Sequence, residues 1–344
     1  MAYDWYVSTD DDAGKPVQTG GRAVAGLERA LGRAATVCGR LSERLRRDGP
    51  ATTARVSYRF ARHRWREYVT LPLLRLRSDD GFVVREVDGH QLPLDLDDPG
   101  LSWRLLVYGE HEPGVEAIWR DVLEEGMVVV DVGSNFGYYT LLAAAQVGET
   151  GHVHAIEPDP SNYEHLARTL ETNDLENVST YDLAVGSTVG TETMFLTAES
   201  NWNTLVDCDS ADWASGYVSE KMDDRTRETI DVETTTLTAF AEDHEIESID
   251  AFRMDVEGYE IEITRGMTDL LAAIDGPCYA FLEVHLKHFE DEERVVTELI
   301  ERYERSGFRP HAVLFGNDAV PIGNDLVETL CSFDDACPHV VLKK

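Results

Sequence analysis

Lysine is scarce in this chain, which has only five lysines among 344 residues. Basic residues number 31 against 65 acidic ones, a formal net charge of −34. Such a polyanion repels the phosphates of nucleic acids, so nucleic-acid binding by the chain as a whole is excluded. An acidic surface with arginine preferred to lysine suits a salt-rich cytoplasm, where screening weakens self-repulsion. We therefore expect a halophile's protein, with an ordinary acidic protein as the alternative.

Cysteine is also rare, and long apolar runs are absent. The five cysteines form no CxxC pair and no spacing typical of a metal site, so we expect reduced structural thiols. The N-terminus carries acidic residues where a secretory signal needs positive charge, and no stretch of eighteen apolar residues occurs. These absences predict a cytoplasmic protein.

Charge and pattern divide the chain into four predicted parts. We expect a flexible polar leader over 1–21, a basic helical region over 22–78, a border segment with a hairpin over 79–104, and a main domain over 105–344. Residues 1–78 hold 15 basic and 8 acidic residues, which leaves 16 of the 31 basic and 57 of the 65 acidic residues for 79–344. The basic and acidic parts of the chain are therefore separate.

Two amphipathic helices are predicted in the basic region, over 23–47 and 54–74, because apolar residues recur there at helical spacing. The second helix interleaves arginines with aromatic residues, which would allow contact with an anionic membrane surface at the inner face. A solvated face, or one lying against the acidic main domain, is the alternative. The oligomeric state is open.

The rest of the chain alternates between strand and helix patterns. A hairpin is predicted over 82–96, turning at Asp88 and Gly89. Strands are predicted over 127–132, 152–156, 178–184, 250–254, 278–284, 309–315 and 339–343, and helices over 137–147, 160–172, 258–273 and 291–305. Residues 186–236 break the rhythm and are interpreted as an insertion near the rim of a site. The alternation predicts an α/β fold with a mostly parallel sheet and helices on both faces.

Ligands of such sheets bind at the carboxyl ends of the strands, and polar residues gather there in this sequence. Asp131 to Gly137 reads DVGSNFG, a glycine turn between a strand and a helix. It departs from the GxGxxG pattern for pyrophosphate, which favours a cofactor with an amino acid part and no phosphate. Glu157 lies twenty residues further on, where an acid accepts the hydroxyls of a ribose. Asp182 could bind an adenine amino group, or could be an ordinary turn residue.

The fourth predicted strand of the main domain leads into a second polar motif, FRMDVEGYE, which contains Asp255, Glu257 and Gly258. At least one of the two carboxylates should face the ligand. Glu260 is interpreted as a residue that favours the positive end of the following helix.

Together these motifs resemble the FkbM family of methyltransferases, which use S-adenosylmethionine, and we expect a member from a halophilic archaeon. DVGSNFGYYTL, AIEPDPSNYEHLARTLETN, LAVG and FRMDVEGYEIEITRG occur in the family's order, and the match covers about 105–315. The resemblance implies a Rossmann-like, seven-stranded class I methyltransferase sheet with an antiparallel last strand, and methyl transfer to an oxygen, often of a sugar. Thr238 departs from the acid expected in the family, which leaves that position without a role.

The resemblance also implies the cofactor-binding residues. Asn173 matches a further polar position of the family. The residues expected to bind the cofactor are Asp131, Gly133, Ser134, Asn135, Gly137, Glu157, Asn162, Asp182, Ala184, Asp255 and Glu257.

Methyl transfer to a sugar hydroxyl needs a base, for which Asp255, Glu283 and His285 are the candidates. His285 and Glu283 share one face of a strand, although a structural role for His285 is equally favoured. A carboxylate acceptor would need an arginine instead, for which Arg253 and Arg265 are available unless they form ordinary ion pairs. Asp255, Glu257 and His285 could ligate a metal by residue type, but no tight motif supports one, so none is expected.

The sequence therefore predicts an O-methyltransferase that acts on a saccharide or glycolipid, with S-adenosylmethionine as cofactor. A nicotinamide-dependent oxidoreductase is the alternative from another reaction class, and it is disfavoured by the missing GxGxxG. A binding or assembly module that holds the cofactor without turnover is the non-enzymatic alternative.

Overall fold

The computed structural model describes residues 65–197, 200–206, 228–286, 289, 291–323, 325–333 and 337–344. The chain divides between Leu73 and Leu74 into two units. Of the first unit only residues 65–73 are described, so the predicted leader, the helix over 23–47 and most of the helix over 54–74 lie outside the described residues. From Arg66 the chain forms a π-helical turn, η1 (Arg66–Thr70), and then α2 (Leu71–Arg75).

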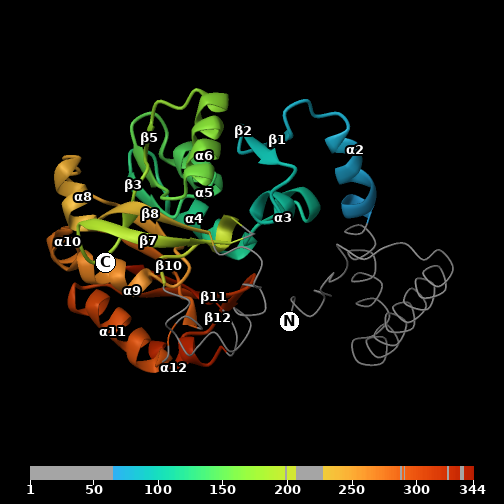
Figure 1. Ribbon diagram of the computed structural model, residues 1–344. Helices are drawn as coiled ribbons and strands as arrows, with labels where there is room; N and C mark the ends of the chain where they lie inside the picture. Colours follow the sequence, from blue (N-terminus) through green and yellow to red (C-terminus); the bar gives the residue numbers. More distant parts are fainter. Residues whose placement is uncertain are drawn as a thin grey trace, which may run out of the picture. The chain divides into compact units, whose positions relative to one another are not determined.

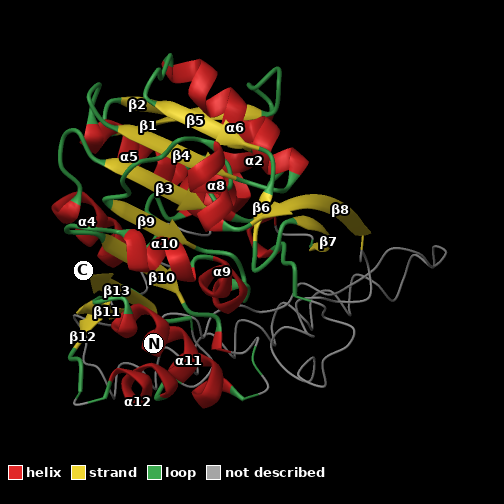
Figure 2. Ribbon diagram, turned by 90° about the vertical axis from the view of Figure 1, so that its left-hand side faces the viewer, coloured by secondary structure: helices red, strands yellow, loops and turns green. Residues whose placement is uncertain are grey.

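The second unit is built on an eight-stranded sheet with the order β12-β11-β13-β10-β9-β3-β4-β5 among the described residues (Figures 1 and 2). Its strands are β3 (Val128–Val132), β4 (His152–Ile156), β5 (Val178–Tyr181), β9 (Ala251–Met254), β10 (Tyr279–Glu283), β11 (Arg309–Phe315), β12 (Asp318–Val320) and β13 (His339–Lys343). β3, β4, β5, β9 and β10 are parallel, whereas β13 runs antiparallel between β10 and β11. This is the class I methyltransferase topology that the sequence predicts, with the short edge strand β12 added.

Helices cover both faces of the sheet (Figure 2). The helices of the second unit are α3 (Leu101–Val107), α4 (Pro113–Val122), α5 (Tyr138–Val147), α6 (Pro160–Asn173), α8 (Leu237–Asp243), α9 (Glu260–Gly266), α10 (Thr268–Ala273), α11 (Glu292–Arg305) and α12 (Leu326–Cys331). One core joins β3 to α4 and α5 around Trp119 and Leu142, and the other packs α8 to α12 around Phe252 and Tyr303. Successive residues of β3 alternate between these cores, so Asp131 faces the same side as Val129, toward α5.

A hairpin of β1 (Phe82–Val87) and β2 (His90–Asp95) turns at Asp88 and Gly89, as the sequence predicts. Two other predictions are wrong in detail. The helix over 258–273 is two helices, because the chain leaves helical geometry at Met267, between α9 and α10. No strand was predicted over 186–236, yet the described residues of this stretch include β7 (Gly190–Leu196) and β8 (Glu228–Thr235), which form a small sheet with β6 (Ala184–Val185).

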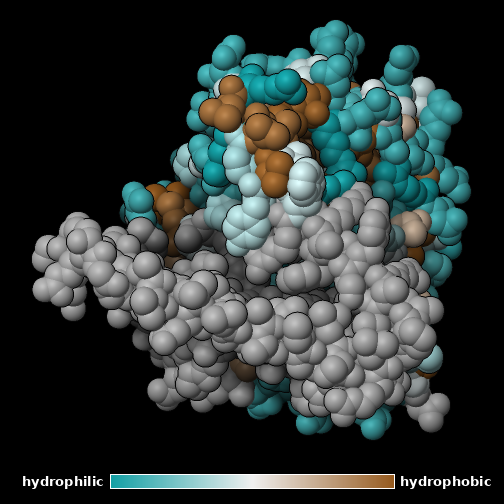
Figure 3. Space-filling view, turned by 90° about the vertical axis from the view of Figure 1, so that its right-hand side faces the viewer, coloured by the Kyte–Doolittle hydropathy of each residue, from teal (hydrophilic) through white to brown (hydrophobic). Residues whose placement is uncertain are grey.

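Hydrophilic residues predominate over the described part of the face in Figure 3, around a small apolar patch. Such a surface agrees with the excess of acidic residues. Among the residues described, no helix combines the length and apolar character that crossing a bilayer requires.

Candidate functional site

The glycine turn predicted as the cofactor loop joins β3 to α5 at the carboxyl edge of the sheet. Gly133 has a left-handed φ of 77°, and a Cβ there would collide with the carbonyl oxygen of Asp255. Asn135 is also left-handed, with φ 51°, and its side chain accepts a hydrogen bond of 2.8 Å from the Phe136 amide. Ser134 is buried and donates to the Ile156 carbonyl. The turn therefore lies directly against the neighbouring strand ends, and only glycine fits at 133.

Glu157 closes one side of this turn. Its carboxylate accepts hydrogen bonds from the amides of Asn135 (2.7 Å) and Asp159 (3.0 Å) and from the side chain of Asn162 (3.4 Å). Asp159 caps α6 through the Asn162 amide. Burial raises the pKa of Glu157 to about 7. An acid that is 4% exposed yet aimed at the cofactor loop fits the predicted ribose ligand.

A buried ion-pair network links the loop to β9. Asp131 and Arg253 are direct partners in the register of β3 and β9, and their side chains lie 3.4 Å apart. Thr140 on α5 donates to Asp131 at 2.7 Å, and Arg253 also donates to Asp255 at 2.6 Å. Burial raises the pKa of Asp131, whereas for Asp255 the effect of burial is outweighed by Arg253, which lowers the pKa. Asp255 is therefore ionised at neutral pH.

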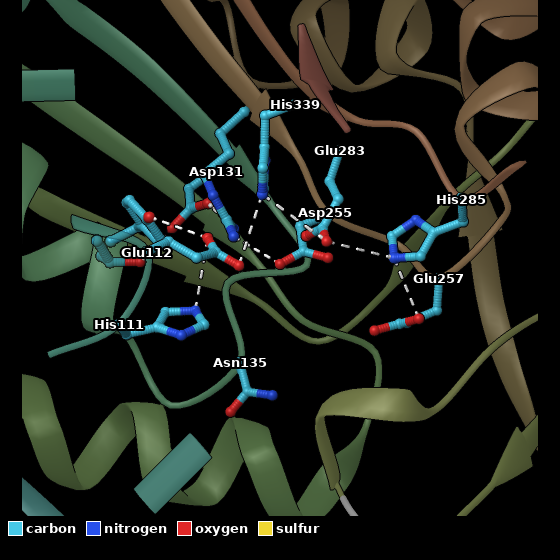
Figure 4. A network of polar contacts seen from close by, with 12 residues as sticks. His111, Glu112, Asp131, Asn135, Asp255, Glu257, Glu283, His285 and His339 are labelled. Atoms are coloured by element: carbon cyan, nitrogen blue, oxygen red, sulfur yellow. Dashed lines mark hydrogen bonds and ion pairs between the residues drawn. The ribbon is translucent and has the colours of Figure 1, made fainter. Parts of the chain in front are cut away.

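His285 follows β10, and its ring is held between the carboxylates of Glu260 and Glu257, the second of which is labelled in Figure 4. Nδ1 lies 2.5 Å from Oε1 of Glu260, and Nε2 lies 3.1 Å from Oε2 of Glu257. Burial opposes the charged ring, but Glu257 and the other acidic groups around it outweigh burial and raise the pKa of His285 well above its usual value. Both ring nitrogens are thus engaged, which favours an orienting role for His285 over proton transfer.

A second cluster lies beside His285 and its two glutamates. It consists of Glu112, Glu283 and His339. Glu283 and His339 are direct partners in the register of β10 and β13. Nε2 of His339 lies 3.6 Å from Oε1 of Glu112 and 3.8 Å from Oε1 of Glu283. Glu112 precedes α4 with φ 42°, and its Oε2 accepts a hydrogen bond from Tyr139. Figure 4 shows these side chains pointing toward one another beside Asp255.

Negative charge is in excess throughout this region. Burial, together with the carboxylates of Asp255 and Glu112, raises the pKa of Glu283 well above its usual range. For Glu112 the effect of burial is outweighed by His111 and His339, which hold the pKa well below its usual range. The cluster can therefore bind a cation or hydrogen-bond donors, and it disfavours anions.

Other predicted positions fall outside this centre. Asp182 is exposed just after β5, and its pKa is raised by partial burial and by the carboxylates of Glu233 and Asp159. Ala184 is buried in β6. Asn173 bonds both backbone groups of Gln91 and so ties α6 to the hairpin. Thr238 donates to the Gly266 carbonyl, a structural contact.

Sequence reasoning missed Glu112 and His339, and it treated Glu260 as a helix-end charge. Glu260 does lie in the first turn of α9, but its carboxylate contacts His285. His339 is the first residue of the antiparallel strand β13, so it lies at the carboxyl edge of the parallel strands. That signal was present in the sequence, because the last strand was predicted to run antiparallel. Arg265 bonds Glu262 and Glu298 and is an ordinary ion-pair partner.

The residues present fit S-adenosylmethionine. Oε2 of Glu157 accepts one hydrogen bond, from the Asn135 amide, and so can still accept from a ribose hydroxyl, whereas Oε1 already accepts from Asp159 and Asn162. Asp255 and Glu257 complement a positively charged sulfonium or ammonium group, and the glycine turn allows close backbone approach.

Comparisons with known proteins identify the family of the chain. The model of the family described as "Methyltransferase FkbM domain" matches residues 131–310. A hexuronic acid methyltransferase, AglP, of Haloferax volcanii is 24% identical over 64% of this chain and 81% of its own. A protein-L-isoaspartate O-methyltransferase of Methanothrix thermoacetophila is 39% identical over 20% of this chain, which spans only 33% of that relative. The crystal structure of an FkbM methyltransferase from Methylobacillus flagellatus aligns with TM-score 0.38 and 11% identity, over 70% of this chain and 52% of that one. The chain therefore belongs to the FkbM family of S-adenosylmethionine-dependent methyltransferases.

Proposed function

We propose that this methyltransferase transfers a methyl group to a hydroxyl oxygen of a saccharide or glycolipid. The observation that carries the proposal is the group of carboxylates beside the cofactor loop, formed by Glu112, Asp255, Glu257 and Glu283. Carboxylates accept hydrogen bonds from hydroxyl groups and select against anionic acceptors. The relative that is named a hexuronic acid methyltransferase supports a sugar acceptor.

The cofactor is assigned to the loop side of this group. In this proposal Glu157 binds the ribose hydroxyls, with Asn162 behind it, and Asp182 and Ala184 border the adenine. The remaining cofactor contacts come from Asp131, Gly133, Ser134, Asn135, Gly137, Asp255 and Glu257. When bound, S-adenosylmethionine supplies a methyl group on a positively charged sulfur, which keeps the C–S electron pair as the new O–C bond forms.

Asp255 is the group that we assign to receive the acceptor proton. The ion pair with Arg253 keeps the Asp255 carboxylate ionised. The backbone carbonyl oxygen of Asp255 lies against Gly133 of the cofactor loop. The same residue therefore borders both the cofactor loop and the acid cluster. Glu283 faces the acceptor, and His285 is a positioning residue whose ring fixes Glu257.

A hydroxyl oxygen is favoured over a carboxylate as the nucleophile. Arg253, which could hold a carboxylate, is already bonded to Asp131 and Asp255. Arg265 pairs with Glu262 and Glu298 on α9 and α11. Neither arginine is left to neutralise an acidic acceptor, whereas a hydroxyl brings no charge into the cluster.

The test uses the full chain with S-adenosylmethionine and two matched oligosaccharides, one neutral and one with uronic acid units. Mass spectrometry should show a product in which one methyl group has replaced one hydrogen. This methyl group should survive mild alkali, because a methyl ether is stable in alkali whereas a methyl ester is hydrolysed. A product that alkali cleaves would contradict the hydroxyl assignment. The exposed-face variant Glu292→Gln serves as the control and should transfer normally, since Glu292 lies in the first turn of α11.

The proposed place of action is the cytoplasm, at the inner face of the membrane if the acceptor is lipid-linked. The predicted lipid contact of residues 22–78 stays a prediction.

A further inference from the structure

Glu112, Glu283 and His339 present three donor atoms of the kinds that divalent cations bind. One carboxylate oxygen from each glutamate and one imidazole nitrogen all lie within 4.8 Å of one another. We propose that these three residues form a divalent metal site that holds the acceptor oxygen, an inference that rests on the proposed function. The spacing of the residues in the sequence did not indicate this site.

The backbone itself sets two of the ligands side by side. Glu283 ends β10 and His339 begins β13, and the antiparallel register pairs them directly. Directly opposed residues of such a pair project to the same face, with Cβ atoms about 5 Å apart. Glu112 approaches from another element, the loop before α4. Ligands from three separate segments of one folded unit give a preformed site rather than a flexible one.

The distances within this triad leave room for a cation between the three donor atoms. Nε2 of His339 lies 3.6 and 3.8 Å from the two carboxylate oxygens, beyond hydrogen-bond length. Donors around an octahedral ion with bonds of about 2.1 Å lie about 3 Å apart when adjacent and about 4 Å apart when opposite. The His339 ring is only 7% exposed, and it aims this nitrogen between the two acids. The buried Nε2 of His339 thus faces two carboxylate oxygens at ion-pair distance, an arrangement in which a divalent cation can take the place of the ring proton.

The neighbouring groups complete the pattern of a metal site. The Tyr139 hydroxyl donates to the other oxygen of Glu112 at 3.1 Å, which orients that carboxylate as outer partners orient metal ligands. The nearby guanidinium group of Arg253 forms ion pairs with Asp131 and Asp255 and not with the two glutamates of the triad. Carboxylate and imidazole ligands suit Mg²⁺ or Mn²⁺, and three protein ligands leave positions open for an acceptor hydroxyl. A hydroxyl on the cation would pass its proton to Asp255 more readily than a free one.

Mn²⁺ alone is the probe, followed by electron paramagnetic resonance on the full chain without cofactor or acceptor. The titration runs in about 1 M KCl, where the Debye length falls to about 3 Å and binding to the acidic surface is suppressed. The wild type should bind one equivalent, and Glu283→Gln and His339→Ala should each weaken binding by more than tenfold. The exposed pair Glu292→Gln and Glu293→Gln on α11 is the matched control and should bind as the wild type does.

Tyr139→Phe keeps all three ligands and removes only the hydrogen bond to Glu112, so it serves if a ligand variant fails to fold. It should weaken Mn²⁺ binding by about tenfold, the lower end for outer-partner changes. Equal Mn²⁺ binding by wild type, Glu283→Gln and Tyr139→Phe would overturn the site, and so would no binding by the wild type.

Methyl transfer in excess chelator separates this proposal from the proposed function. Transfer that stops with chelator and returns with Mn²⁺, while S-adenosylmethionine binding is unchanged, supports the metal site. Transfer to a hydroxyl that proceeds fully in chelator refutes the metal site and leaves the proposed function intact. Binding of one Mn²⁺ at these residues without transfer to any saccharide supports the site and counts against the acceptor class.

Discussion

Protonation of Glu157 should control cofactor affinity near neutral pH. Its pKa is raised to about 7 by burial, and its carboxylate must be ionised to accept both hydroxyls of a ribose. At pH 5.5 about 3% of the carboxylate is ionised, so binding should be about 30-fold weaker than at alkaline pH, a difference of about 2 kcal/mol. Affinity should thus rise with pH and level off above about pH 8.

Isothermal titration calorimetry with S-adenosylmethionine at pH 5.5 and 8, at constant salt, measures this difference. Glu157→Gln is the matched variant, because it keeps the size and one acceptor oxygen but cannot ionise. It should bind more weakly than the wild type at pH 8 and lose most of the pH dependence. The reasoning fails if the wild type binds equally at both pH values, or if the variant keeps the full dependence.

The same shift has an opposite effect on the stability of the cofactor-free protein. The folded-state pKa of Glu157 lies above its ordinary value of 4.5, so the folded state holds the proton more tightly than the unfolded state. Glu157 therefore adds about 3 kcal/mol to the free energy of unfolding below about pH 4.5, and this contribution is lost as the pH rises to about 7. Cofactor binding should therefore stabilise the protein most at the upper end of this range.

Three further outcomes are expected. Gly133→Ala should abolish cofactor binding and lower the melting temperature, because its Cβ collides with the Asp255 carbonyl; calorimetric binding at wild-type strength would speak against the described loop. Thr140→Val should lower the unfolding free energy in urea by about 1 to 3 kcal/mol, since it leaves the buried Asp131 short of a hydrogen bond, and Thr140→Ser should restore most of it. Asp255→Asn should cut kcat by about 100-fold or more and should also weaken cofactor binding, since it removes a charge that faces the cofactor; an unchanged kcat would remove Asp255 as the proton acceptor.

The sheet and the cofactor loop were predictable because they depend on local pattern. The apolar run before Asp131, the glycines at 133 and 137 and the acid at 157 predict a strand, a turn and an acid beside that turn from spacing alone, and the structure confirms these three features. The binding of ribose by Glu157 stays a prediction. Membership in the FkbM family followed from these motifs together, and it removes the nicotinamide-dependent oxidoreductase alternative.

The acceptor side was less predictable because it depends on register and on distant segments. His339 lies 56 positions after Glu283 in the chain, and only the pairing of β10 with β13 makes them neighbours. Glu112 sits in a loop that no strand pattern marks. The break at Met267 and the strands within 186–236 were missed for a similar reason, since tertiary packing decides both.

The position of β13 makes the candidate site's edge a late part of the sheet to be completed. This strand follows β10 and β11 in the chain yet inserts between them, so during synthesis the edges of β10 and β11 that pair with it stay open until residues 339–343 emerge. A slip of one residue in that final pairing would turn His339 to the opposite face. Chains that stall before this insertion would carry the glycine turn over 133–137 but would lack the pairing of Glu283 with His339, so the five residues of β13 decide whether this edge of the sheet is complete.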